Sequence, residues 1–172
     1  MTLLRADLDA AQLSWPRALA RLLVLDPFWL VAAYRCAHWL GASSIRFLPA
    51  LIHGWARVIW AADISPSARI GGGLLIPHPA GVVVGEDVVC GDRLTLYQGT
   101  TLGSRGGRRS YEQDGPRLGD GVTVGAGGCV LGPVTVGDDV WIGANAVVLE
   151  DVPAGSTAVG RSSSDDGYII EG

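Results

Sequence analysis

Basic charge and histidine are scarce in this sequence of 172 residues. Its 13 Lys and Arg residues are outnumbered by 17 Asp and Glu residues, which gives a formal net charge of −4. Because nucleic-acid binding needs a basic face, this balance argues against a general nucleic-acid-binding protein. No histidine follows His78, so a metal site built from several histidine ligands is not expected in that part of the chain.

Cysteine is rare as well. The three residues, Cys36, Cys90 and Cys129, are odd in number and lack the spacing of metal ligands. We therefore expect reduced thiols, in or near the core of a cytoplasmic protein.

We expect neither a signal peptide nor a transmembrane helix in this sequence. The N-terminal stretch MTLLRADLDA lacks the continuous apolar region and the small-residue cleavage site of a signal peptide. The apolar stretch 18–40 is interrupted by Arg21, Asp26, Pro27 and Arg35, which argues against a transmembrane helix.

A helical pattern occupies the N-terminal segment 1–62. In the stretch 27–40, PFWLVAAYRCAHWL, apolar residues recur at three-to-four spacing, and LPALIHGWARVIW (48–60) behaves similarly. Five of the six tryptophans precede Ala61. We interpret this Trp-rich segment as packing against the same protein or its oligomer, in preference to a peripheral membrane contact.

From Ile64 onward, aliphatic residues recur at every sixth position in two runs. They are Ile64, Ile70, Ile76, Val82, Val88 and Leu94, then Leu118, Val124, Val130, Val136, Ile142 and Val148. This period fits neither a helix nor strand alternation and is typical of hexapeptide parallel β-helices, in which three units close a triangular coil of about 18 residues. The sequence predicts a mainly β fold, with a helical segment 1–62, a β-helix 63–160 and a C-terminal tail 161–172.

A polar, glycine-rich segment separates the two runs. GSRGGRRSYEQDGPR (103–117) cannot fill interior positions without burying charge, so we predict an excursion loop that leaves the β-helix and returns. Long loops in compact domains are usually functional, although a tolerated surface insertion is the alternative. Arg105, Arg108 and Arg109 are candidates to receive a phosphate or carboxylate.

Three longer motifs resemble the hexapeptide-repeat acyltransferases, most closely the serine acetyltransferases. They are DISPSARIGGGLLIPHPAGVVVGE (63–86), LTLYQGTTLG (94–103) and VTVGAGGCVLGPVTVGDDVWIGANAVVLEDVPAGSTAVG (122–160). The helical segment AYRCAHWL (33–40) is also similar to the helix before the repeat in that family. The resemblance implies a left-handed parallel β-helix, a homotrimer with sites between adjacent subunits, and acetyl-CoA as donor with no metal.

The resemblance also implies a catalytic pair. His78, in the His-x-x-Gly motif, corresponds to the general base, and Asp63, in the Asp-Ile-x-Pro motif, to the residue that orients it. Their spacing is slightly less than one coil, so the two side chains can lie near one corner. A carboxylate that holds one ring nitrogen leaves the other free to take a proton from an acceptor hydroxyl. A structural role is the alternative for His78, and it is the interpretation we favour for His38 and His53.

Donor binding is assigned to backbone groups. The position of the motif LTLYQGTTLG makes the N–H groups near Gly103 candidate oxyanion donors. Small residues of later coils permit close approach of a pantetheine arm. These candidates are Gly125, Ala126, Gly143 and Ala144, for each of which an ordinary tight-corner role is the alternative.

The sequence departs from the serine acetyltransferases where the family holds its acceptor. The Asp that directly precedes the base in that family is Pro77 here, and the Arg-His pair of the excursion loop is Asp114 and Gly115. Losing a charged partner costs roughly 2–5 kcal/mol for each desolvated contact. Acceptor binding is therefore assigned to Arg105, Arg108, Arg109 and Asp114 in the loop.

These observations predict an acetyl-CoA-dependent O-acetyltransferase that acts on a hydroxyl of a small molecule or sugar other than free serine. One alternative is a genuine serine O-acetyltransferase of cysteine biosynthesis with a rebuilt pocket. Another is a non-catalytic β-helix scaffold, which the apolar N-terminal segment favours and the joint presence of Asp63 and His78 disfavours.

Overall fold

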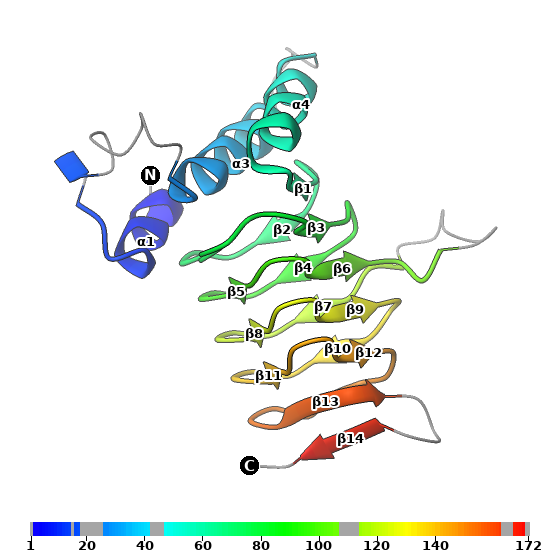
Figure 1. Cartoon of the computed structure of the whole chain (residues 1–172). Helices are drawn as coiled ribbons and strands as arrows, with labels where there is room; N and C mark the ends of the chain where they lie inside the picture. The colour runs from blue at the N-terminus through cyan, green and yellow to red at the C-terminus, as the bar shows by residue number, and fades with distance from the viewer. Residues whose placement is uncertain are drawn as a thin grey trace.

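The structure is a computed structural model, and it describes residues 2–14, 16–17, 26–41, 47–106, 114–162 and 167–170. Three helices come first: α1 (Thr2–Ala10), α3 (Phe28–Gly41) and α4 (Phe47–Trp60). Helices α3 and α4 pack against each other at one end of a stack of coils, and α1 lies beside the first coils (Figure 1). No helix in the described ranges is long and apolar enough to cross a membrane.

Short strands form the rest of the described chain. They are β1 (Asp63–Ile64), β2 (Arg69–Ile70), β3 (Val83–Val84), β4 (Val89–Cys90), β5 (Thr95–Leu96), β6 (Thr101–Gly103), β7 (Arg117–Leu118), β8 (Thr123–Val124), β9 (Cys129–Leu131), β10 (Thr135–Val136), β11 (Trp141–Ile142), β12 (Val147–Val148), β13 (Thr157–Ser162) and β14 (Gly167–Ile170). Three parallel ladders run down the stack: β1-β3-β6-β9-β12, β2-β4-β7-β10 and β5-β8-β11-β13. They are the three faces of a β-helix, and β14 closes its end by pairing antiparallel with β13 (Figure 1).

The six-residue period marks the interior of this β-helix. All twelve aliphatic residues of the two runs are buried, and none is more than 5% exposed. Each coil therefore covers the apolar side chains of the next, which is how stacked repeats make a continuous core. The predicted fold class, a mainly β left-handed parallel β-helix with an N-terminal α-helical segment, is confirmed.

The register shows which coil is the longest. Val83 pairs with Thr101, one regular coil further on, whereas Thr101 pairs with Cys129 across a longer stretch of chain. The additional residues lie between β6 and β7, where the chain leaves the coil after Gly103 and rejoins the stack at Arg117.

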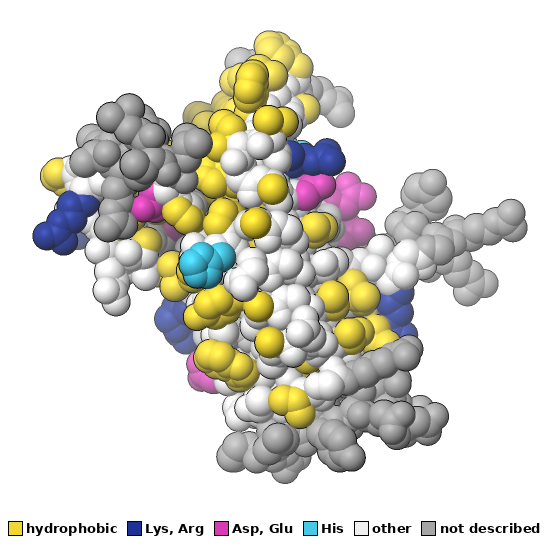
Figure 2. Space-filling view, viewed as in Figure 1, with side chains coloured by type: hydrophobic (Ala, Val, Ile, Leu, Met, Phe, Trp, Pro, Cys, Tyr) yellow, Lys and Arg dark blue, Asp and Glu magenta, His cyan; other side chains and the backbone are white. Residues whose placement is uncertain are grey.

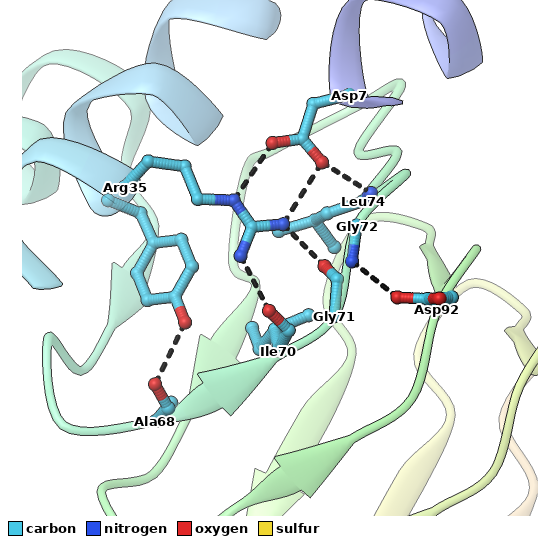
Figure 3. Close-up of polar contacts among 9 residues, drawn as sticks. Asp7, Arg35, Ala68, Ile70, Gly71, Gly72, Leu74 and Asp92 are labelled. Atoms are coloured by element: carbon cyan, nitrogen blue, oxygen red, sulfur yellow. Dashed lines mark hydrogen bonds and ion pairs between the residues drawn. The ribbon is translucent and has the colours of Figure 1, made fainter. Parts of the chain in front are cut away.

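A buried ion pair fixes the helices on the first coil (Figure 3). The guanidinium of Arg35 on α3 donates to both carboxylate oxygens of Asp7 on α1, at 2.8 and 3.0 Å. It also donates to the carbonyl oxygens of Ile70 and Gly71, and Asp7 accepts the N–H of Leu74 at 2.8 Å. The side chain of Asp7 is fully buried, and these contacts compensate its charge and satisfy both of its oxygens.

The thiols only partly match the prediction. Cys90 is buried, and desolvation raises its pKa to about 12, so it stays a neutral core thiol. Cys129 is half-buried. Cys36 is exposed on α3, so its assignment to the core or its edge is wrong, because that helix turns Phe28, Val31 and Tyr34 inward instead.

Candidate active site

His78 lies on a short bulge of the first coil. Leu75 pairs with Thr95 in the next coil. Ala80 and Gln98 are equivalent positions, since their carbonyls accept the N–H groups of Gly99 and Gly127 in the coils below. The segment 76–79 thus stands where the next coil has only 96–97, and the imidazole of His78 is exposed. This local lengthening presents the imidazole outside the stack.

The corner that follows the bulge repeats down the β-helix, and we call it the His78 corner. It consists of the residue pairs Ala80–Gly81, Gln98–Gly99, Ala126–Gly127 and Ala144–Asn145, joined by hydrogen bonds of 2.8–2.9 Å from each coil to the one above. The second residue of each pair has a positive φ, between 57° and 76°. Glycine adopts this conformation at little cost, and asparagine tolerates it better than most other residues.

Four of the five predicted donor-binding residues gather at the His78 corner, and Gly103 does not. Ala126 and Ala144 belong to it directly, and Gly125 and Gly143 precede them on the same two coils. A Cβ at Gly125 would lie 2.8 Å from the backbone nitrogen of Ala144, so no side chain fits between these coils. Ala144 is exposed. The corner that runs down the stack from His78 therefore offers backbone groups, the methyl groups of Ala126 and Ala144, and the exposed polar residues Gln98 and Asn145.

A pocket of about 190 Å³ opens on the other side of the bulge. It lies between α1, the start of α3 and the first coil, and Ile76 and Pro77 form part of its wall. Most of its lining is apolar. Of its two carboxylates, Asp7 is fully engaged with Arg35 and Leu74, and Asp26 accepts the N–H of Phe28 at 3.0 Å at the start of α3.

Asp63 is bonded to helix α4 in the isolated chain. His53 Nε2 lies 2.7 Å from Asp63 Oδ1, and Arg57 Nε lies 3.4 Å from Asp63 Oδ2. Because an ionised carboxylate only accepts, His53 Nε2 carries the proton in this bond. Within the described chain Asp63 makes no hydrogen bond to His78, so the carboxylate–imidazole pair formed here is Asp63 with His53.

Sequence reasoning missed His53 and Arg57 as site residues. The six-residue repeat begins only after them, and His53 fits an ordinary position in the helical pattern. A signal was available: they are four residues apart, hence on one face of α4, and that helix leads directly into the strand that carries Asp63.

Two residues in the described part of the excursion, Arg105 and Gly115, contact the β-helix. Arg105 is exposed, its Nε donates to the carbonyl of Leu131 at 3.2 Å, and its side chain covers Gly132. Asp114 is half-buried where the chain returns. A Cβ at Gly115 would lie 2.6 Å from the backbone of Asp87, so that position accepts only glycine. Arg108 and Arg109 lie outside the described residues.

Gly103 ends β6 at the edge of the excursion. Its carbonyl accepts the N–H of Gly132 at 2.8 Å, and a Cβ at this position would meet open space. Across the described ranges, no group of three or more His, Cys, Asp or Glu side chains is placed to hold a metal ion. The available chemistry is that of an exposed imidazole beside a corner of backbone groups.

Comparison with known proteins agrees with this geometry. No protein-family model matches the chain. A serine acetyltransferase of Helicobacter pylori is 48% identical over 142 residues, which are 83% of this chain and 82% of that protein. The chloroplastic serine acetyltransferase 1 of Arabidopsis thaliana is 46% identical over 134 residues, 78% of this chain, but the match spans only 42% of that longer protein.

The solved structures most relevant here are also serine acetyltransferases. Soybean serine acetyltransferase in complex with serine superposes with a TM-score of 0.85 at 37% identity, covering 98% of this chain and 68% of that one. Serine acetyltransferase of Brucella abortus in complex with coenzyme A gives a TM-score of 0.85 at 32% identity, covering 99% and 67%. The repeat, the bulge with its exposed histidine and these similarities together show that the chain belongs to the serine acetyltransferase family of hexapeptide-repeat acyltransferases.

Proposed function

We propose that the protein is an acetyl-CoA-dependent O-acetyltransferase and that the hydroxyl of serine is its acceptor. The observation that carries the proposal is the exposed His78 at the head of a corner whose lower coils hold Gly125, Ala126, Gly143 and Ala144. Relatives of this chain support the two substrates, since one has been solved with serine and another with coenzyme A.

His78 acts as general base in this proposal. Its free ring nitrogen takes the proton of the acceptor hydroxyl while the hydroxyl oxygen attacks the thioester carbonyl of acetyl-CoA. A tetrahedral intermediate forms, and the proposed donors to its negative oxygen are backbone N–H groups near Gly103. Because Gly103 ends β6 away from the His78 corner, these donors would come from across the proposed subunit boundary. The C–S bond then breaks, the acetyl ester remains on the acceptor, and the thiolate of CoA takes the proton from the imidazolium.

Asp63 is the proposed orienting partner of this base. Its side chain is 40% exposed although it is bonded to His53 and Arg57, so part of the carboxylate remains accessible to a further imidazole. In this proposal His78 reaches it across a subunit boundary or after a change in the local arrangement. We propose a homotrimer with shared sites, which the outward-facing apolar residues Val83 and Trp141, 39% and 51% exposed on two faces of the β-helix, support.

A second acceptor class is favoured by a specific observation. Pro77 and Asp114 stand where the family carries an acidic and a basic acceptor-binding group, and packing against Asp87 restricts position 115 to glycine. These substitutions make a hydroxyl on a sugar or another small molecule without amino-acid charges the second candidate acceptor. Arg105 and Asp114 are the described loop residues proposed to contact such an acceptor.

Thiol release from acetyl-CoA tests both versions. Wild-type protein is incubated with serine and, separately, with a panel of sugars and hydroxylated small molecules, and CoA is titrated with a chromogenic disulfide. Saturable, serine-dependent release with O-acetylserine as product supports the first acceptor, and release with another hydroxyl alone supports the second. No acceptor-dependent release above the rate of His78→Ala would refute the proposed activity.

A further inference from the structure

A histidine and an arginine of α4 converge on the carboxylate of Asp63, and neither belongs to the hexapeptide repeat. We propose that His53 is a positioning residue for acetyl transfer: it holds Asp63 in place so that the carboxylate can orient His78. Arg57 assists more weakly. This inference rests on the proposed function, because it assigns His53 an effect on catalysis through Asp63 rather than a contact with substrate.

The geometry of the His53 bond is that of a firm contact. The distance between Nε2 and Oδ1 is 2.7 Å, and the side chain of His53 is only 23% exposed. Arg57 is different, since its Nε lies 3.4 Å from Oδ2 and its side chain is 59% exposed. Exposed ion pairs of that kind contribute little, so His53 is the main anchor of the carboxylate.

Asp63 is held at its backbone as well as at its side chain. Its N–H donates to the carbonyl of Val82 at 2.8 Å, and Gly81 donates to the carbonyl of Ala61 at 2.8 Å. Val82 in turn donates to the carbonyl of Pro79, the residue after His78. The segment that carries Asp63 is therefore hydrogen-bonded to the turn that follows the bulge, and a movement of α4 would displace both.

The environment of His53 leaves Asp63 as its one close polar partner in the described chain. On the side of α3 its ring faces a small, mainly apolar pocket lined by Leu30, Ala33, Tyr34, Ala37, Ile52, Ala56 and Ile64. Tyr34 is neutral there, since burial raises its pKa to about 12, and its hydroxyl donates to the carbonyl of Ala68. The charged groups that face His53 are Asp63 and Arg57.

This arrangement has a chemical consequence. Once His78 reaches Asp63 and takes a proton, a carboxylate whose position His53 already fixes stabilises the imidazolium with less ordering of its own. A catalytic group that is misplaced by as little as about 1 Å can lose on the order of 100-fold in rate. Loss of one of two contacts to the carboxylate should cost less, on the order of 10-fold.

The test compares His53→Leu, His53→Gln and a matched control, His38→Gln. Glutamine can still donate a hydrogen bond to Asp63, whereas leucine cannot. His38 is the suitable control because it also lies on a helix and bonds the first coil, through Nδ1 and the carbonyl of Pro66 at 2.8 Å. We expect kcat to fall about 10-fold for His53→Leu, with KM for acetyl-CoA unchanged, and to stay within about threefold of wild type for the two glutamine variants.

A double mutant separates positioning from general destabilisation. If His53 acts through Asp63, then His53→Leu should have no further effect on kcat in an Asp63→Asn background. Additive losses, or a His53→Leu variant as active as wild type, would overturn the inference while leaving the proposed function standing. Wild-type protein without acceptor-dependent thiol release would overturn the proposed function, and this inference with it. Thermal unfolding of each variant confirms that the compared proteins are folded.

Discussion

The β-helix buries the apolar side chains of its repeat, whereas helix α4, which precedes it, exposes a row of them. In the β-helix the twelve aliphatic residues of the six-residue period are at most 5% exposed. On α4, Phe47, Leu51, Trp55 and Val58 are between 52% and 77% exposed, and Figure 2 shows hydrophobic side chains gathered over that helix. Their spacing of three and four residues places them on one face.

The difference follows from how each region finds a partner for its apolar surface. A coil is covered by the next coil, which presents the same residue type at the same position. Helix α4 packs mainly on α3, and so one of its faces stays uncovered in the described chain. The interior of the β-helix is therefore covered by its own coils, whereas the helical segment contributes mainly by the groups that it binds. Helix α4 binds Asp63, and Arg35 on α3 binds the first coil.

The largest effect is expected when the imidazole of His78, which lies outside the core of the β-helix, is removed. His78→Ala should lower kcat for acetyl transfer by about 100- to 10,000-fold, the range attributed to general acid–base catalysis. Because the imidazole is exposed on the bulge, the melting temperature should change little. Thiol-release kinetics measure the loss in kcat, and thermal unfolding measures the melting temperature. A variant with near wild-type kcat would show that the base lies elsewhere, and His53 would be the next residue to examine.

The next largest effect is expected at the buried ion pair of Asp7 and Arg35, through which the helices contact the first coil. Asp7→Asn leaves the buried guanidinium of Arg35 without its counter-charge, and breaking such a pair typically costs about 3–5 kcal/mol. The exposed Asp9 on the same helix provides a control, since Asp9→Asn should stay within about 0.5 kcal/mol of wild type. Urea unfolding measures both. Equal stability of the two variants would mean that the helices are not coupled to the stack.

The fold could be predicted from the sequence because its rule is local and repeated. Each interior residue, from Ile64 to Val148, is specified by the same short pattern, so one missed unit would not have changed the result. The exposure of Cys36 could not be obtained in this way, because α3 is apolar over much of its surface and its periodicity does not single out the buried face.

The candidate site was predictable only in part. His78 and the small residues of the corner were found through family motifs that occur within the repeat. The bond between His53 and Asp63 joins a helix to the strand that follows it, and the two partners come together only because α4 turns into β1 at Ala61, with φ of 51°. The spacing of His53 and Arg57 places both on one face of α4, but it does not say that this face meets Asp63, since that contact depends on how the helix packs on the first coil.

A paired substitution tests the contrast between the regions directly. Ile142→Ala removes three carbons from a fully buried position of the β-helix and should destabilise the protein by about 2–5 kcal/mol. Val58→Ala, at a position 77% exposed on α4, should change stability by less than about 0.5 kcal/mol. Chemical denaturation of the two variants gives the comparison. A large loss for Val58→Ala would show that another molecule or segment covers α4 under the conditions of the measurement.

The smallest expected effect is a loss of stability in mild alkali. Burial raises the pKa of Cys90 from 9.0 to about 12 and that of Tyr34 from 10.0 to about 12. Both groups therefore keep their protons up to a higher pH in the folded state than in the unfolded chain. Their stabilising contribution is complete below about pH 9 and is lost as the pH rises toward 12. Between pH 8 and pH 10 the unfolding free energy should fall by about 1–2 kcal/mol. Cys90→Val, which retains the apolar volume and removes the thiol, should reduce this slope, because most of the change below pH 10 comes from Cys90 rather than from Tyr34. An unchanged slope would show that the thiol ionises alike in the folded and unfolded chains, and hence that water reaches the second coil.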